Sequence, residues 1–290
     1  MFKRAVFTDE VSQNLQTVVD VSLEYGLDGI EIRSLWDTPP QELVSQLPKI
    51  KEMLKDTGLA VCSIASPFFK CDLDSQEEYT QHLGILRNCI ELAQALNCRI
   101  IRGFTFWRKG KLEKQWNKIL SKFEEPVKIL EAEDMYMAIE NEASTSIGTG
   151  KVLARFLEEI DSPRIGSMWD PANSLFDEDV EEVPYPDGYE AIKDRMIHMH
   201  LKDAGKDPET GEMVCTPIGE GEIDFRGQFN ALMEDGYEGY VSLETHWRPV
   251  KLSKEELDRP GGSAFSESGE YASRLCLDNW SRILEELGLM

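Results

Sequence analysis

The stretch MYMAIENEAS, residues 135–144, is the starting point for predicting the fold. It has the pattern of a buried strand that is followed by two acidic residues. Apolar residues alternate along it until Glu140, which is separated from Glu142 by one asparagine. Small polar residues and glycine then follow, as expected of a loop. An acid at the end of one buried strand has many explanations, so its meaning depends on how the other strands end.

Eight strand-like runs alternate with helical patterns along the whole chain. Amphipathic helices are indicated by apolar residues at three-to-four spacing, as in Leu15, Val18, Val19 and Leu23. The predicted strands are 4–9, 29–34, 59–66, 98–104, 135–141, 165–170, 196–203 and 240–246. Eight strand-helix units predict an α/β protein with a closed (β/α)8 TIM barrel, formed as a single domain by residues 1–290. Pro126 predicts a kink or break in the helix at 112–132.

Composition narrows the class of function. The 290 residues include 31 Lys and Arg against 54 Asp and Glu, and this net charge of −23 makes nucleic acid a poor partner. We expect no membrane segment, because no run approaches 18 apolar residues. The start, MFKRAVFTDE, lacks the apolar core of a signal peptide, and the six cysteines show no CxxC spacing. A cytoplasmic protein without disulfides is therefore expected.

Four consecutive predicted strands end on metal-ligand residue types: Glu140, Asp170, His200 and Glu244. Each one alone would more often be a helix cap, a solvated acid or a core histidine. Together at one barrel mouth, three carboxylates would repel one another unless a cation lay between them. Oxygen-rich ligands predict one divalent ion, with Mn²⁺ as first choice and Mg²⁺, Co²⁺ or Zn²⁺ as alternatives. Glu142 lies two residues further along the chain and is the nearest alternative to Glu140.

Other polar residues near the strand ends are candidates for substrate contacts or catalysis. Lys202 is a candidate for catalysis, because it would place an ammonium near an oxygen that becomes negatively charged in the reaction; otherwise it would pair with Asp203 or Glu220. The pair Glu31 and Arg33 either binds substrate or forms an internal ion pair, and the internal pair is the safer expectation. The remaining candidates for substrate binding are Arg102, Trp107, Asn173 and His198, of which His198 is expected a layer deeper in the barrel. The long connections at 203–224 and 247–268 are expected to wall or cover a pocket.

At these residues the chain resembles the xylose isomerase-like TIM-barrel superfamily of sugar phosphate isomerases and epimerases. The motifs that carry the resemblance are GLDGIEIR (26–33), IEN (139–141), WDPAN (169–173), HLKD (200–203), PIGEGEIDF (217–225) and GYVSLE (239–244). The resemblance implies that Glu140, Asp170, His200 and Glu244 bind metal, and that Glu140 and Glu244 transfer protons. Asn173 stands where many relatives carry histidine. The apurinic-site endonucleases of this fold need three zincs and more than the four histidines present here.

The resemblance implies a metal-dependent isomerase or epimerase that acts on a ketose or sugar phosphate. Its two glutamates would move a proton through an enediolate that the metal stabilises. An alternative is a dehydratase of a cyclic ketone such as an inosose or 3-dehydroshikimate, in which Lys202 or His198 would act as the acid. A barrel that only binds sugars is less expected. The partner is in each case a small sugar or polyol-derived ketone, and a homo-oligomer is compatible with the sequence.

Overall fold

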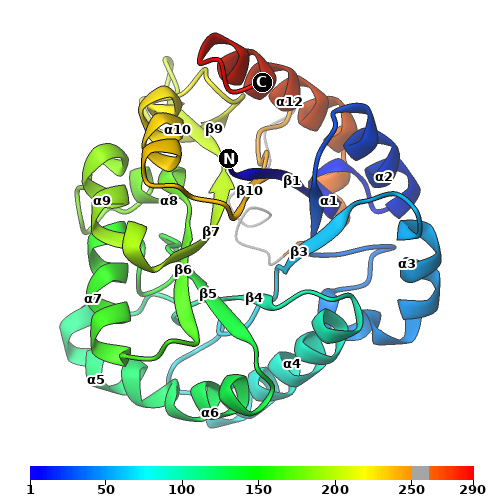
Figure 1. Cartoon of the computed structure of the whole chain (residues 1–290). Coiled ribbons are helices and arrows are strands. Elements are labelled where there is room, and N and C mark those ends of the chain that lie inside the picture. Colours follow the sequence, from blue (N-terminus) through cyan, green and yellow to red (C-terminus); the bar gives the residue numbers. More distant parts are fainter. Residues whose placement is uncertain (250–260) are drawn as a thin grey trace.

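The computed structural model describes residues 1–249 and 261–290. Within that part of the chain, eight parallel strands close into a barrel in the order β1-β10-β7-β6-β5-β4-β3-β2, with helices around them (Figure 1). The predicted TIM barrel is therefore confirmed. The barrel strands are β1 (Lys3–Phe7), β2 (Gly29–Ile32), β3 (Ala60–Ile64), β4 (Ile100–Gly103), β5 (Tyr136–Glu140), β6 (Ile165–Trp169), β7 (Met196–Leu201) and β10 (Tyr240–Leu243).

Helices follow the strands and cover the outside of the barrel. The α-helices are α1 (Thr8–Val11), α2 (Leu15–Glu24), α3 (Leu47–Leu54), α4 (Gln76–Ala95), α5 (Leu112–Lys122), α6 (Glu124–Ala132), α7 (Gly150–Ile160), α8 (Pro171–Leu175), α9 (Tyr189–Ile192), α10 (Phe225–Glu234) and α12 (Gly269–Glu286). Shorter 3-10 or π turns are η1 (Pro40–Gln46), η2 (Pro184–Gly188), η3 (Lys193–Arg195) and η4 (Ser263–Ser266).

Two connections depart from simple strand-helix alternation. The predicted helix at 112–132 is broken at Phe123 into α5 and α6, and Pro126 lies in the first turn of α6. Proline is tolerated there because the first N–H groups of a helix have no partner within it. The predicted loop at 203–224 contains an antiparallel hairpin of β8 (Asp203–Lys206) and β9 (Met213–Thr216). Residues 250–260 of the predicted loop at 247–268 lie outside the described residues.

Aromatic side chains fill the layer between the barrel and its helices. Phe156 of α7 is fully buried, with its ring centroid 5.0 Å from that of Phe123 and 6.4 Å from that of Trp116. Replacing Phe156 by alanine is expected to lower the free energy of unfolding by about 3–5 kcal/mol, because a large cavity would remain. The midpoint of guanidinium unfolding measures this. Leu23→Ala, at a position 49% exposed on α2, is the control and should change stability by less than about 0.5 kcal/mol.

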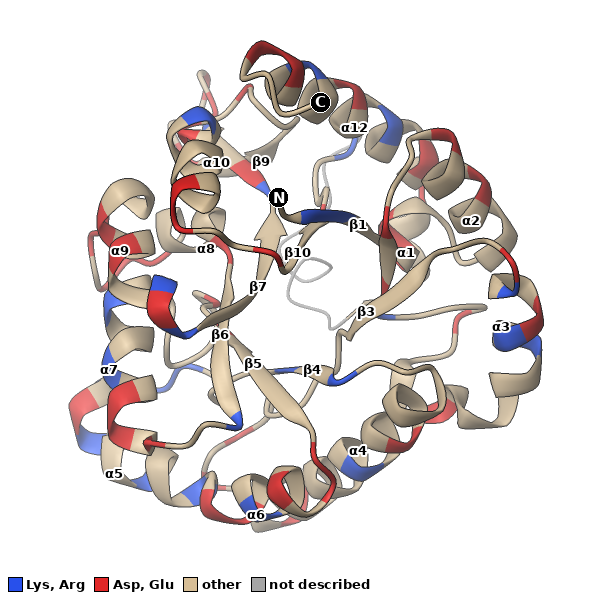
Figure 2. Ribbon diagram, in the orientation of Figure 1, with Lys and Arg blue, Asp and Glu red and all other residues tan. Residues whose placement is uncertain are grey.

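The charged residues lie mainly on the outer helices, where acidic and basic segments alternate (Figure 2). Among the described residues, no helix is both long and apolar enough to cross a membrane. The charges buried inside the barrel are a separate group, and they gather at the carboxyl ends of the strands.

Candidate metal centre

The four predicted ligands come from neighbouring barrel strands. Glu140 is the last residue of β5, Asp170 directly follows β6, His200 lies in β7, and Glu244 directly follows β10. Because β10, β7, β6 and β5 are consecutive in the barrel, their ends meet on one side of its mouth. One ligand atom from each residue lies within 4.8 Å of the others, and all four residues are buried. The structure thus brings together the residues that the strand ends predicted.

The arrangement fits a divalent ion. Two ligands that each lie about 2.1 Å from an ion are at most about 4.2 Å apart, so only a small contraction of the cluster is needed. His200 Nδ1 lies 3.4 Å from Glu140 Oε1, 3.9 Å from Asp170 Oδ2 and 3.8 Å from Glu244 Oε2. Among the described residues, the buried His200 Nδ1 lacks a hydrogen bond of good geometry, and the cation nearest to Asp170 Oδ2 is the Lys202 ammonium at 2.7 Å. Unsatisfied buried atoms of this kind are expected where a ligand belongs.

The electrostatics of the cluster indicate the same need for positive charge. Burial lowers the pKa of His200, but Glu140 and Glu31 outweigh burial and raise that pKa to about 10. Burial, together with Glu244 and Glu140, raises the pKa of Asp170 to about 6 despite the opposing effect of Lys202. A divalent ion would reverse both shifts, because ligation requires a neutral imidazole and a carboxylate.

Asp170 has two roles that one carboxylate can combine. Its Oδ1 accepts hydrogen bonds from the backbone N–H groups of Ala172 and Asn173, at 3.0 and 3.2 Å, and so caps α8. Its Oδ2 is left facing the other ligands. The helix-cap explanation and the ligand explanation are therefore compatible here.

Lys202 points into the cluster. Its Nζ lies 2.7 Å from Asp170 Oδ2 and 2.9 Å from Glu244 Oε2, so the expected alternative pairing with Asp203 or Glu220 is wrong. Asp203 instead accepts backbone N–H groups, among them those of Gly219 and Gly221. Burial lowers the pKa of Lys202, yet Asp170 and Glu244 outweigh burial and hold it well above the usual value. Lys202 is therefore an ammonium that partly neutralises the carboxylates.

Two arginines and an amide hold the glutamates. Arg102 Nη1 donates to Glu140 Oε2 at 3.1 Å, and Arg33 Nη1 donates to Glu244 Oε1 at 2.8 Å. Asn173 Nδ2 donates to Glu140 Oε1 at 3.0 Å. Burial raises the pKa of Glu244, but Lys202 and other cations outweigh it and keep this pKa well below the usual value. Arg33, Arg102 and Asn173 thus orient the acids, and whether they also bind substrate stays a prediction.

Glu31 and His198 lie on the floor of the site. Both are fully buried, and His198 precedes His200 by two residues, one layer deeper on β7. His198 Nε2 lies 2.8 Å from Glu31 Oε2. The expected ion pair between Glu31 and Arg33 is wrong, since Arg33 pairs with Asp9, Glu10 and Glu244. Glu31 and His198 therefore neighbour His200 and lie below the mouth of the barrel.

A second charged layer was missed in the sequence. Glu10 accepts hydrogen bonds from Arg33 at 2.7 Å and from Arg248 at 2.6 Å, and its Oε1 lies 2.9 Å from His246 Nδ1. Burial raises the pKa of Glu10, but Arg248, His246 and Arg33 hold it far below the usual value. The available signal was the acidic pair Asp9 and Glu10 directly after the first predicted strand.

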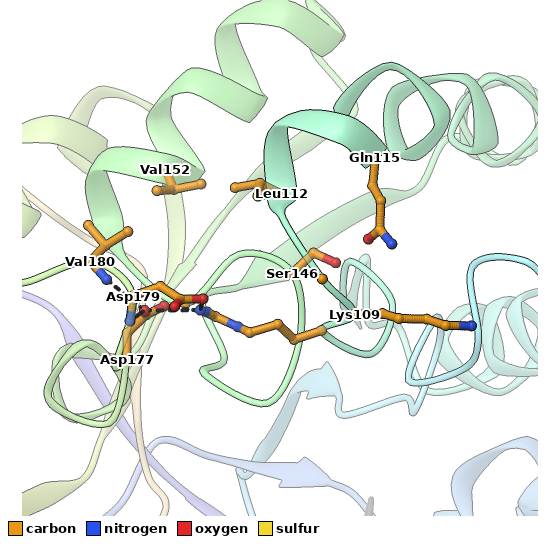
Figure 3. Close-up of a pocket in the computed structure, with 11 residues that line it drawn as sticks. Lys109, Leu112, Gln115, Ser146, Val152, Asp177, Asp179 and Val180 are labelled. Carbon is orange, nitrogen blue, oxygen red and sulfur yellow. Dashed lines mark hydrogen bonds and ion pairs between the residues drawn. The ribbon is translucent and has the colours of Figure 1, made fainter.

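Trp107 lies in the segment that follows β4. It is half-buried, and its ring centroid is 5.6 Å from Lys70 Nζ, so a substrate contact stays a prediction. A hollow lies between the segments that follow β4, β5 and β6, and it is lined by side chains that include Gln115 and Val152 (Figure 3). Its Arg108 is already paired with Asp177 and Asp179. Lys109, which also lines the hollow, pairs with Asp72 and Asp74, so each charged residue of the lining has an ion-pair partner.

The chain matches the family model described as "Xylose isomerase-like TIM barrel" over residues 19–267, and it belongs to that family. An inosose dehydratase from Yersinia enterocolitica is 24% identical over 250 residues, covering 78% of this chain and 80% of the relative. Two solved structures show the same fold at 16% identity. They are the probable 3-DHS dehydratase AsbF from Bacillus anthracis (TM-score 0.74, 97% and 99% covered) and the IolI protein with a binding zinc atom (TM-score 0.72, 98% and 99% covered).

Proposed function

We propose that the protein is a cytoplasmic, divalent-metal-dependent dehydratase that removes water from a cyclic polyhydroxy ketone of the inosose type. The observation that carries the proposal is the buried cluster of Glu140, Asp170, His200 and Glu244, with the Lys202 ammonium inside it. The choice of dehydratase over the isomerase or epimerase implied by the resemblance is supported by the inosose dehydratase relatives. Mn²⁺ remains the proposed ion because three of the four ligands are oxygen donors.

The proposed reaction needs a base, a polarised ketone and positive charge beside the reacting oxygens. When bound, the ion supplies Lewis-acid polarisation of the ketone, which makes the adjacent C–H more acidic. Glu140 or Glu244 then takes the proton from that carbon, since both are ionised and face the cluster. The C–O bond on the next carbon of the ring breaks, a C=C bond forms between this carbon and the deprotonated one, and the glutamate returns its proton to the departing hydroxide, which leaves as water.

Of the two residues expected to act as the acid, Lys202 is better placed than His198 to stabilise the oxygens that gain negative charge in the reaction. Its ammonium lies within 2.9 Å of two ligand carboxylates at the mouth, whereas His198 is fully buried below His200. Because the pKa of Lys202 is raised, it stays charged and donates hydrogen bonds to oxygens that gain negative charge. It is not suited to act as the base that removes the proton from carbon.

Product analysis tests this function. Purified protein with Mn²⁺ and an inosose is expected to yield a product lighter by one water, detected by mass spectrometry and by the absorbance of the conjugated ketone. A panel of ketoses and sugar phosphates serves as the comparison. Conversion of a ketose to a product of unchanged mass, without dehydration of any cyclic ketone, would contradict the proposal and restore the isomerase or epimerase alternative.

A further inference from the structure

The floor of the metal centre contains a line of polar side chains that the proposed reaction does not use. His198 Nε2 lies 2.8 Å from Glu31 Oε2 and 3.1 Å from Ser242 Oγ. The other oxygen of Glu31, Oε1, lies 3.5 Å from His200 Nε2. These four side chains come from β2, β7 and β10 and are all fully buried.

Each nitrogen of the His200 ring has a distinct neighbour. Nδ1 faces the carboxylates of Glu140, Asp170 and Glu244, and Nε2 faces Glu31. Both His200 Nε2 and Glu31 Oε1 lack another hydrogen-bond partner among the described residues. Two unsatisfied buried atoms of complementary type, 3.5 Å apart, are poised to form one hydrogen bond with a small shift.

Burial of the Glu31 carboxylate lowers the stability of the fold unless another interaction compensates for its desolvation. Glu31 and its histidine neighbours are removed from water, and an apolar set of the same volume would avoid that desolvation. Histidine ligands of metals commonly donate their second N–H to a carboxylate, which selects the tautomer, orients the ring and increases the basicity of the ligating nitrogen.

We infer that Glu31 is a positioning residue for the metal centre: it accepts the Nε2–H of His200, so that Nδ1 presents its lone pair to a divalent cation, while His198 holds Glu31 in place. The inference rests on the proposed metal-dependent function and concerns the affinity for the ion rather than the identity of the substrate. It replaces the expectation that Glu31 and His198 contact substrate.

The test is the affinity of the chelator-treated full chain for Mn²⁺, measured by calorimetry in wild type, Glu31→Gln and a control. Glu31→Gln keeps the volume and one acceptor oxygen but removes the charge, and a loss of affinity of about 10- to 100-fold is expected. Glu182→Gln is the matched control, because Glu182 is also a buried glutamate but bonds the backbone N–H groups of Gly150 and Lys151. It should destabilise the fold and leave the affinity within about twofold.

A second readout follows the ring itself. In the Zn²⁺-loaded wild type, the Nε2–H of His200 is expected as a slowly exchanging proton in the NMR spectrum, and in Glu31→Gln it should shift and exchange faster. Unchanged Mn²⁺ affinity and an unchanged His200 proton in folded Glu31→Gln would overturn the inference and leave the proposed function intact. Failure of the wild type to bind any divalent ion would overturn the proposed function and the inference together.

Discussion

Replacing Glu140 by glutamine is expected to lower kcat for dehydration by about 10²–10⁴-fold, the usual range when a group that transfers a proton is removed. Arg102 and Asn173 donate to different oxygens of Glu140, at 3.1 and 3.0 Å, and glutamine keeps the volume and one of these two acceptors, so the protein should still fold. It cannot accept a proton from carbon, and it is a weaker ligand for a divalent ion. Steady-state kinetics at saturating Mn²⁺ separates the loss of turnover from the loss of metal.

Glu142→Gln is the control for this prediction. Glu142 lies two residues beyond Glu140, but its carboxylate faces Lys70 at 3.4 Å and the hydroxyl of Ser144 at 3.0 Å. Its loss should change kcat by less than about tenfold. If Glu142→Gln were as inactive as Glu140→Gln, or if Glu140→Gln kept full turnover, the proposed assignment of the β5 acid would be wrong.

Removal of divalent ions is the second change expected to have a large effect. Dialysis against a chelator should reduce dehydration to the background rate, and added Mn²⁺ should restore it. Because an ion that binds only the folded protein stabilises it, Mn²⁺ at 100 times its Kd should add about 2.7 kcal/mol. For a chain of this size that corresponds to a rise in Tm of roughly 5 °C, which a thermal melt with and without the ion measures.

Asp170→Asn provides the control for the thermal shift. This variant keeps the Oδ1 that caps α8 but loses the charge of the oxygen that faces the cluster. The rise in Tm with Mn²⁺ should therefore shrink or disappear, while the fold is retained. Full activity of chelator-treated wild type, with no detectable bound ion, would contradict the assignment of a metal centre.

The barrel and the four clustered residues were predictable because they depend on local patterns. Alternating apolar residues predict the strands, and parallel strands in a barrel must deliver their carboxyl ends to one face. Glu140, Asp170, His200 and Glu244 could be read from strand ends alone. The short hairpin of β8 and β9 was not predicted, since its segments are brief and carry no apolar alternation.

The pairing of charges could not be predicted, because it depends on barrel register and side-chain reach. Arg33 and Glu31 are near neighbours in sequence, yet Arg33 bonds Glu244, 211 residues away, and Glu31 bonds His198, 167 residues away. Period-two alternation places Glu31 and Arg33 on the same side of the β2 strand but at different heights. Which opposing group each one meets is determined by the other strands, and a single sequence does not indicate that.

The order of strands in the ring has a consequence for how the protein matures. Three of the proposed ligands come from β5, β6 and β7, whereas Glu244 follows β10, which is also the strand that joins β1 and completes the ring. A polypeptide still emerging from the ribosome therefore lacks a full coordination shell until its last strand is available. Tight binding of the ion would then indicate that the ring of strands is complete.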